Sequence, residues 1–266
     1  MNTVDNSRLI LVPCDFTPLA FHAMEHGAYM SKAMNCNLLI LHVTSHEAEI
    51  PALTKKMHFI AEDCFVKCDV RPGVLVRYGS SPYSVIKTVT TEINPVLVIL
   101  KSGGGVRTVK ILSGTSTPFL VIQDTPKSEV MTNISFPINF LNKTDEKLIR
   151  VIHFSDYYPD ATMRIITPSG KGVEMERVVA SNTSLTKKVM ENQGIKLDFV
   201  THDKHKNDAE TILELSKGMD MIVIQMEEYS LFSRLLFGLR EEKLFKNHDK
   251  IPVLCFKNIK DLKKKE

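Results

Sequence analysis

The amino-acid sequence predicts an α/β protein with two tandem domains, each built on a doubly wound parallel sheet. Short, continuous apolar runs recur along the chain, as in strands that are buried on both faces of a sheet. Amphipathic segments of helical length separate these runs. The series then repeats, with an offset that stays near 124 residues through the first four strands, which indicates a tandem duplication. We place the first domain at residues 1–125 and the second at residues 131–266.

The first half begins with a strand at residues 8–15, which holds the apolar run from Leu9 to Val12. Thr17 is predicted to be the N-cap of a helix at residues 18–34, with Pro18 at its first position. A strand at 38–43 and a helix at 52–67 follow.

The next strand, at residues 74–78, leads to a helix at 82–93 with Ser81 as N-cap and Pro82 at the first position. Pro95 ends that helix before the strand at 96–100. The half finishes with a short helix at 106–113 and a strand at 119–123.

A polar linker at residues 124–129 precedes the second half, in which the strand pattern begins again. Its strands are predicted around residues 136–140, 163–168, 197–201, 221–225 and 251–255.

Composition excludes several classes of protein. With 266 residues, of which 43% are hydrophobic and 24% charged, the chain is large enough for two modest cores. The net charge of +3 is small, and the lysines near the C-terminus have no arginine or aromatic cluster beside them, so no nucleic-acid partner is expected. The N-terminus lacks the pattern of a signal peptide, and no apolar run is long enough to span a bilayer. We therefore predict a cytoplasmic protein without a membrane partner.

A glycine-rich break follows the strand at 96–100 and reads Lys101-Ser102-Gly103-Gly104-Gly105. In an open parallel sheet, ligands bind beyond the carboxyl ends of the strands, and glycines let backbone N–H groups approach phosphates. The equivalent stretch of the second half, residues 226–229, is acidic and has no glycine.

With Val12-Pro13-Cys14-Asp15, Leu41-His42-Val43 and the duplicated pattern, residues 8–257 resemble a tandem universal stress protein. The resemblance implies two five-stranded, adenine-nucleotide-binding-like sheets with strand order 3-2-1-4-5. It also implies nucleotide-binding positions at Asp15, at Val43 beside adenine and, if a nucleotide binds, at Gly103, Gly104 and Gly105. An acid at the start of a helix and a core valine are the alternative interpretations of Asp15 and Val43.

The phosphate-binding motif of that family, G-x2-G-x9-G-[S/T], is degenerate in both halves. One alignment keeps Gly104-x9-Gly114-Thr115 but places Lys101 at the first glycine. The favoured alignment instead places a deletion in the phosphate-binding loop of the first half. There Val96 to Pro118 spans 22 positions (118 − 96), whereas the equivalent Met221 to Pro252 of the second half spans 31 (252 − 221). The second half keeps the length of the loop but has Gln225 and Glu228 in place of the early glycines.

Two further patterns are weighed as metal sites. His22 and His26 lie four residues apart, as do Cys64 and Cys68, but neither pair has a third ligand nearby in the sequence, so no metal is expected. The two histidines are interpreted as part of a solvated helix face. Five cysteines, an odd number, argue against a disulfide framework.

The functional hypothesis is a non-enzymatic, regulatory stress-response protein that binds no cofactor and acts through an unidentified protein partner. The resemblance implies that the halves pack as an intramolecular pseudo-dimer, and the apolar run around Phe232 and Phe237 leaves a homodimer open. The alternative is a sensor in which the first domain binds ATP or another adenine nucleotide or nucleoside. A hydrolase ranks below both, because fold alone does not imply chemistry.

Overall fold

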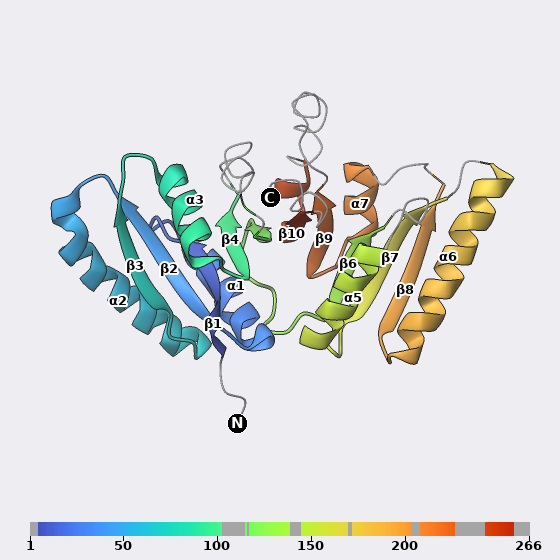
Figure 1. Ribbon diagram of the computed structural model, residues 1–266, viewed down its shortest axis with the longest axis horizontal. Coiled ribbons are helices and arrows are strands. Elements are labelled where there is room, and N and C mark those ends of the chain that lie inside the picture. Colours follow the sequence, from blue (N-terminus) through green and yellow to red (C-terminus); the bar gives the residue numbers. More distant parts are fainter. Residues whose placement is uncertain are drawn as a thin grey trace. The chain divides into compact units, whose positions relative to one another are not determined.

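The computed structural model (Figure 1) describes residues 5–102, 115, 117–138, 145–169, 172–203, 208–226 and 243–257. The described chain divides into two compact units. Unit 1 takes in the part up to Glu129 together with residues 255–257, and unit 2 takes in the part from Val130 to Leu254. Each unit is described by itself below.

Unit 1 alternates strands and helices, as the apolar runs predict. Its elements are β1 (Asp5–Pro13), α1 (Pro18–Met34), β2 (Cys36–Thr44), the 3-10 helix η1 (Glu47–Glu49), α2 (Ile50–Cys68), β3 (Gly73–Tyr78), α3 (Pro82–Ile93), β4 (Leu97–Lys101) and β5 (Phe119–Ile122). The predicted helix at 106–113 lies outside the described residues.

The strands of unit 1 are parallel and have the order β3-β2-β1-β4-β5, so the predicted order 3-2-1-4-5 is confirmed. Two crossovers run from β1 toward β3, and the third returns to β4 on the other side of β1. Because such crossovers are right-handed, α1 and α2 cover one face of the sheet and α3 covers the other (Figure 1).

The helix starts follow the predicted capping residues only in part. Ser81 caps α3 as predicted, with its hydroxyl accepting a hydrogen bond from Ser84 N at 3.4 Å. Thr17 occupies the N-cap position of α1, but its side chain makes no capping hydrogen bond. Its hydroxyl is instead engaged by two charged side chains of the candidate site, described below.

Unit 2 repeats the arrangement of unit 1. Its elements are β6 (Asn133–Pro137), α5 (Asp145–Tyr157), β7 (Thr162–Pro168), α6 (Val173–Asn192), β8 (Lys196–His202), α7 (Ala209–Leu215) and β9 (Met221–Met226), and β10 (Val253–Lys257) follows along the chain. Its strands β9, β6, β7 and β8 are neighbours in this order, as β4, β1, β2 and β3 are in unit 1.

Strand register shows the duplication at the level of single residues. Ile10 pairs with Leu97 between β1 and β4, and Ile134 pairs with Met221 between β6 and β9. The pair in unit 2 is the pair in unit 1 moved along the sequence by 124 positions. Ile134 lies 124 residues after Ile10 (134 − 10), and Met221 lies 124 residues after Leu97 (221 − 97). Ile10 and Ile134 are both completely buried, so the two copies also use the repeated position in the same way.

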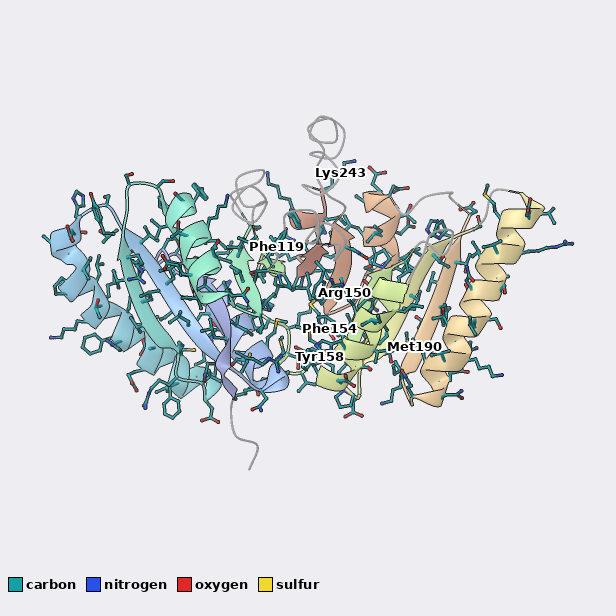
Figure 2. All side chains as sticks on the ribbon, in the orientation of Figure 1. Phe119, Arg150, Phe154, Tyr158, Met190 and Lys243 are labelled. Carbon is teal, nitrogen blue, oxygen red and sulfur yellow. The ribbon has the colours of Figure 1, made fainter. Side chains whose placement is uncertain are left out.

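Each unit has its own apolar core. In unit 1, Phe119 of β5 is among the largest fully buried side chains. In unit 2, Phe154 and the neighbouring Tyr158 come from α5 and its end, Met190 comes from α6, and all three are at most 4% exposed (Figure 2). None of the helices that the structure describes is both long and apolar enough to cross a membrane.

Asp220, just before β9, anchors the start of β6. Its Oδ2 accepts hydrogen bonds from Thr132 N at 2.7 Å, Asn133 N at 2.9 Å and Thr132 Oγ1 at 3.2 Å. Since these bonds are made to a carboxylate, we expect Asp220→Ala to lower the stability of unit 2 by about 1–3 kcal/mol in urea unfolding. Asp160→Ala is the matched control, because that carboxylate makes only a surface ion pair and its loss is expected to cost less than about 1 kcal/mol. Equal losses in the two variants would contradict the anchoring role.

Candidate functional site

The candidate site lies at the carboxyl end of the unit 1 sheet, between β1 and β4. These central strands are neighbours, but their crossovers leave in opposite directions, which makes this the topological switch point of the sheet. Asp15 follows the end of β1, and Lys101 is the last residue of β4. Parallel pairing of the two strands therefore brings together residues that are 86 positions apart in the sequence.

Asp15 accepts hydrogen bonds within the protein through both of its carboxylate oxygens. Lys101 Nζ donates a short hydrogen bond to Asp15 Oδ2 and a second one, 2.9 Å long, to Thr17 Oγ1. Thr17 Oγ1 in turn donates to Asp15 Oδ1 at 2.7 Å, and Thr17 N lies 3.3 Å from the same oxygen. Both carboxylate oxygens of Asp15 thus have donors before any ligand arrives.

The charges of the pair set the protonation of Asp15. Partial burial alone raises the pKa of the carboxyl, but the hydrogen bonds from Lys101 and Thr17 and the positive charge of Lys101 bring the pKa below its ordinary value. Asp15 is consequently a carboxylate at neutral pH. It is unsuited to act as a general acid there.

The backbone of Phe16 is strained, and contacts of its side chain help to stabilise this conformation. Its φ of 63° lies in the left-handed region, which is costly for a bulky residue. The ring centroid lies 4.3 Å from that of His42, and Lys56 Nζ lies 3.8 Å from the Phe16 ring centroid. A cation–π contact of this kind contributes about 0.5–1 kcal/mol at an exposed site, so it offsets part of the strain.

A hydrogen bond between His42 of β2 and Cys14, which follows β1, connects these two strands. His42 Nδ1 donates a hydrogen bond of 2.8 Å to the carbonyl oxygen of Cys14. Burial raises the pKa of the Cys14 thiol, although a hydrogen bond from the Phe16 backbone opposes the shift. The thiol therefore stays protonated at neutral pH and is a poor nucleophile.

The other predicted ligand positions divide into two groups. Val43 lies in β2, pairs with Arg77 of β3 and is half-buried. Gly103, Gly104 and Gly105 lie outside the described residues. The carboxylate of Asp15 also accepts a hydrogen bond from the backbone N–H of Thr17, immediately before α1.

The interpretation of His22 and His26 as one solvated helix face is wrong for His26. The His26 side chain is buried, with 4% exposure, and its Nε2 donates to the carbonyl oxygen of Asp124 at 3.1 Å. The sequence interval of 98 residues hides this contact, because it depends on the face that α1 presents to the segment after β5. Across the described part of the chain, no group of three or more His, Cys, Asp and Glu side chains could hold a metal ion.

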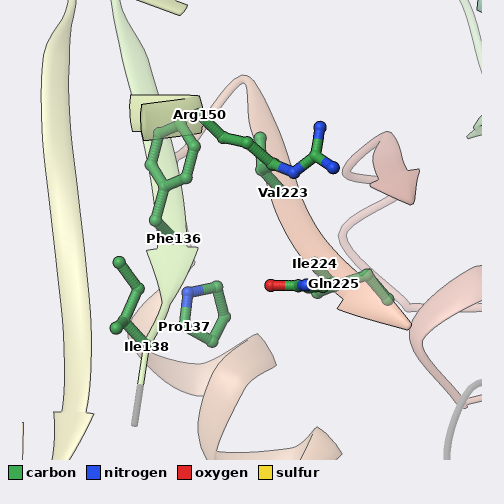
Figure 3. Close-up of a pocket in the computed structure, with 7 residues that line it drawn as sticks. All are labelled: Phe136, Pro137, Ile138, Arg150, Val223, Ile224 and Gln225. Atoms are coloured by element: carbon green, nitrogen blue, oxygen red, sulfur yellow. The ribbon is translucent and has the colours of Figure 1, made fainter. Parts of the chain in front are cut away.

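The same place in unit 2 has different chemistry. A shallow pocket there, enclosing about 250 Å³ with open solvent included, is lined by Phe136, Pro137, Ile138, Arg150, Val223, Ile224 and Gln225 (Figure 3). Gln225 of β9 corresponds in register to Lys101, so the cation of unit 1 is replaced by an amide. Glu228 and Asn139, which lies 124 positions after Asp15, are outside the described residues.

Structural comparison places the whole chain among known folds. A universal stress protein from Archaeoglobus fulgidus DSM 4304 superimposes with a TM-score of 0.69 at 14% sequence identity, over 96% of this chain and 98% of that one. The chain has the universal stress protein fold. A protein of unknown function from Pseudomonas aeruginosa PAO1 has a TM-score of 0.67 at 15% identity, over 97% and 98% of the two chains. A scan against protein-family models and a sequence search of curated proteins give no match.

Within the universal stress protein fold, the contact of Lys101 with Asp15 and Thr17 was the feature missed by the sequence analysis. In one of the two alignments, Lys101 stands at the position of the first glycine of the motif, and no partner was predicted for its side chain. A usable signal was present, because oppositely charged residues follow two strands that the fold makes neighbours. The direction of the Lys101 side chain, back over the end of β1, needed the structure.

Proposed function

We propose that this protein is a non-enzymatic, regulatory stress-response protein of the universal stress type that does not bind an adenine nucleotide in the usual way. The observation that carries the proposal is the engagement of both Asp15 oxygens by Lys101 and Thr17. A ligand hydroxyl that bound Asp15 would have to displace the ammonium group of Lys101 and would exchange an ion pair for a hydrogen bond whose donor carries no charge.

Action through a protein partner is the second part of the proposal. Its support is a row of exposed apolar side chains on α6, namely Met175, Val178, Leu185 and Val189, each between 44% and 64% exposed. Apolar side chains gathered on one helix typically mark an interaction surface.

The alternative, an adenine-nucleotide sensor in unit 1, is favoured by one observation. Lys101 and Lys56 place two ammonium groups around the Asp15–Phe16 segment, and such groups attract phosphate. Under this alternative, Lys101 would leave Asp15 and pair with the ligand.

Calorimetric titration with MgATP, ADP, AMP and adenosine distinguishes the two functions. For the wild-type protein we expect Kd values weaker than about 1 mM, corresponding to less than about 4 kcal/mol of binding free energy. We also expect no ADP or AMP above the buffer background after incubation with ATP.

Asp15→Asn is the matched variant, because it keeps the shape of the side chain and removes its charge. If neither the wild type nor Asp15→Asn binds these ligands, the result agrees with the proposal. Micromolar binding by the wild type that Asp15→Asn weakens at least about tenfold would establish the sensor instead, since one charge-assisted hydrogen bond contributes about 1.5–3 kcal/mol.

A further inference from the structure

Two cysteines of α2 form a paired cluster away from the candidate site. Cys64 and Cys68 lie four residues apart in the last turn of the helix, so their side chains project from the same face. They are 3% and 2% exposed, so both thiols are buried. Neither cysteine takes part in a disulfide.

Polar groups of α1 enclose the two thiols from the opposite side. Burial raises the pKa of Tyr29 to about 12, and the nearby Cys68 adds to the rise. Glu25, only 8% exposed, pairs with Lys67 of α2 at 2.5 Å. A carboxylate and a phenol therefore lie near two sulfur atoms where α1 packs against α2. A pair of apolar side chains would fill this contact with a lower desolvation cost.

The thiols are protonated, and they lie where the helix can open. Burial raises the pKa of Cys64 to about 12, and the neighbouring Cys68 adds to the rise. Cys68 is the last residue of α2, and Asp69 ends the helix in the left-handed conformation. Because helix ends fray at little cost, a small reagent can reach this turn although the resting thiols are buried.

We propose that Cys64 and Cys68 form a chelating dithiol site for trivalent arsenic compounds and similar thiophilic metalloids. Soft thiolate sulfur suits such centres, and a pair of thiols held together binds them in two-point fashion. For an arsenoxide, two As–S bonds form and the bond from arsenic to its oxide oxygen is broken. The two thiol protons leave with that oxygen as water, and arsenic stays trivalent, so no oxidant or reductant is needed.

The test uses the reduced, full-length protein with phenylarsine oxide, followed by intact-mass spectrometry. One phenylarsenic group per chain is expected, with loss of two protons from the protein. This adduct is expected to survive an excess of a monothiol and to be removed by a small dithiol, because only the latter matches the chelation. A wild-type protein that takes up no arsenical would overturn the proposal.

Single-site variants assign the adduct to the pair. Cys64→Ser and Cys68→Ser are each expected to weaken apparent affinity at least about 100-fold, since either change leaves one-point attachment. Cys36→Ser is the control, as Cys36 is another buried thiol with a pKa raised to about 11, but lies apart in β2. Unchanged affinity in Cys64→Ser, or loss in Cys36→Ser, would overturn the assignment. Cys64→Ala and Cys68→Ala, checked by circular dichroism, replace any serine variant that fails to fold.

Discussion

Acidification from pH 7 to pH 4 is expected to lower the free energy of unfolding by about 3 kcal/mol through His26 alone. Burial lowers the pKa of His26 from its usual 6.5 to about 4 in the folded protein, although the hydrogen bond to Asp124 opposes the shift. Between these two values the unfolded chain binds a proton that the folded chain does not. The stabilisation is therefore complete above pH 6.5 and is lost as the pH falls toward 4.

Urea unfolding at several pH values between 7 and 4 measures this effect, with His26→Gln as the test variant. Glutamine keeps a hydrogen-bond donor toward Asp124 but cannot titrate, so the variant is expected to lose about 3 kcal/mol less than the wild type over this range. His58→Gln is the control, because His58 is exposed on α2 and its replacement is expected to leave the pH profile unchanged. If the free energy of unfolding changed equally with pH in the wild type and in His26→Gln, the folded protein would not hold His26 in its neutral form.

Alanine at either repeated core position is expected to destabilise its own unit by about 2–5 kcal/mol. Ile10 and Ile134 occupy equivalent places in the central strands β1 and β6, and both are 0% exposed. Removing three carbon atoms loses their transfer free energy and leaves a cavity that the neighbouring strands fill only in part.

Hydrogen exchange read by mass spectrometry locates the effect of each change. Ile10→Ala is expected to speed exchange in β1, β2 and β4, and Ile134→Ala in β6, β7 and β9, because these are the strands that pair with each changed one. The two variants act as controls for each other. Uniform acceleration along the whole chain in both variants would mean that the units unfold together.

The strands were predictable because a strand buried on both faces needs a continuous apolar run, and that pattern is local. The run from Leu9 to Val12 predicted β1, and Ser81 with Pro82 predicted the start of α3. The near-constant offset between the halves predicted the duplication, which the pairing of Ile10 and Ile134 with their equivalent partners shows residue by residue.

The candidate site was predictable only in outline. Asp15 was identified from the sequence as a ligand position, which stays a prediction, but its contacts with Lys101 and Thr17 were not foreseen. Thr17 is the N-cap residue of α1 as predicted, but its hydroxyl bonds to Asp15 and Lys101 and not to the backbone at the start of the helix.

By itself, the sequence determined the order of strands and helices, the duplication and the resemblance to universal stress proteins, since all three depend on patterns within short windows or between equivalent windows. Only the tertiary structure decided which polar groups meet. Asp15 and Lys101 are 86 residues apart, and His26 and Asp124 are 98 apart. Such pairs form because parallel pairing aligns the strand ends and packing selects one helix face, and neither choice is encoded next to the residues concerned.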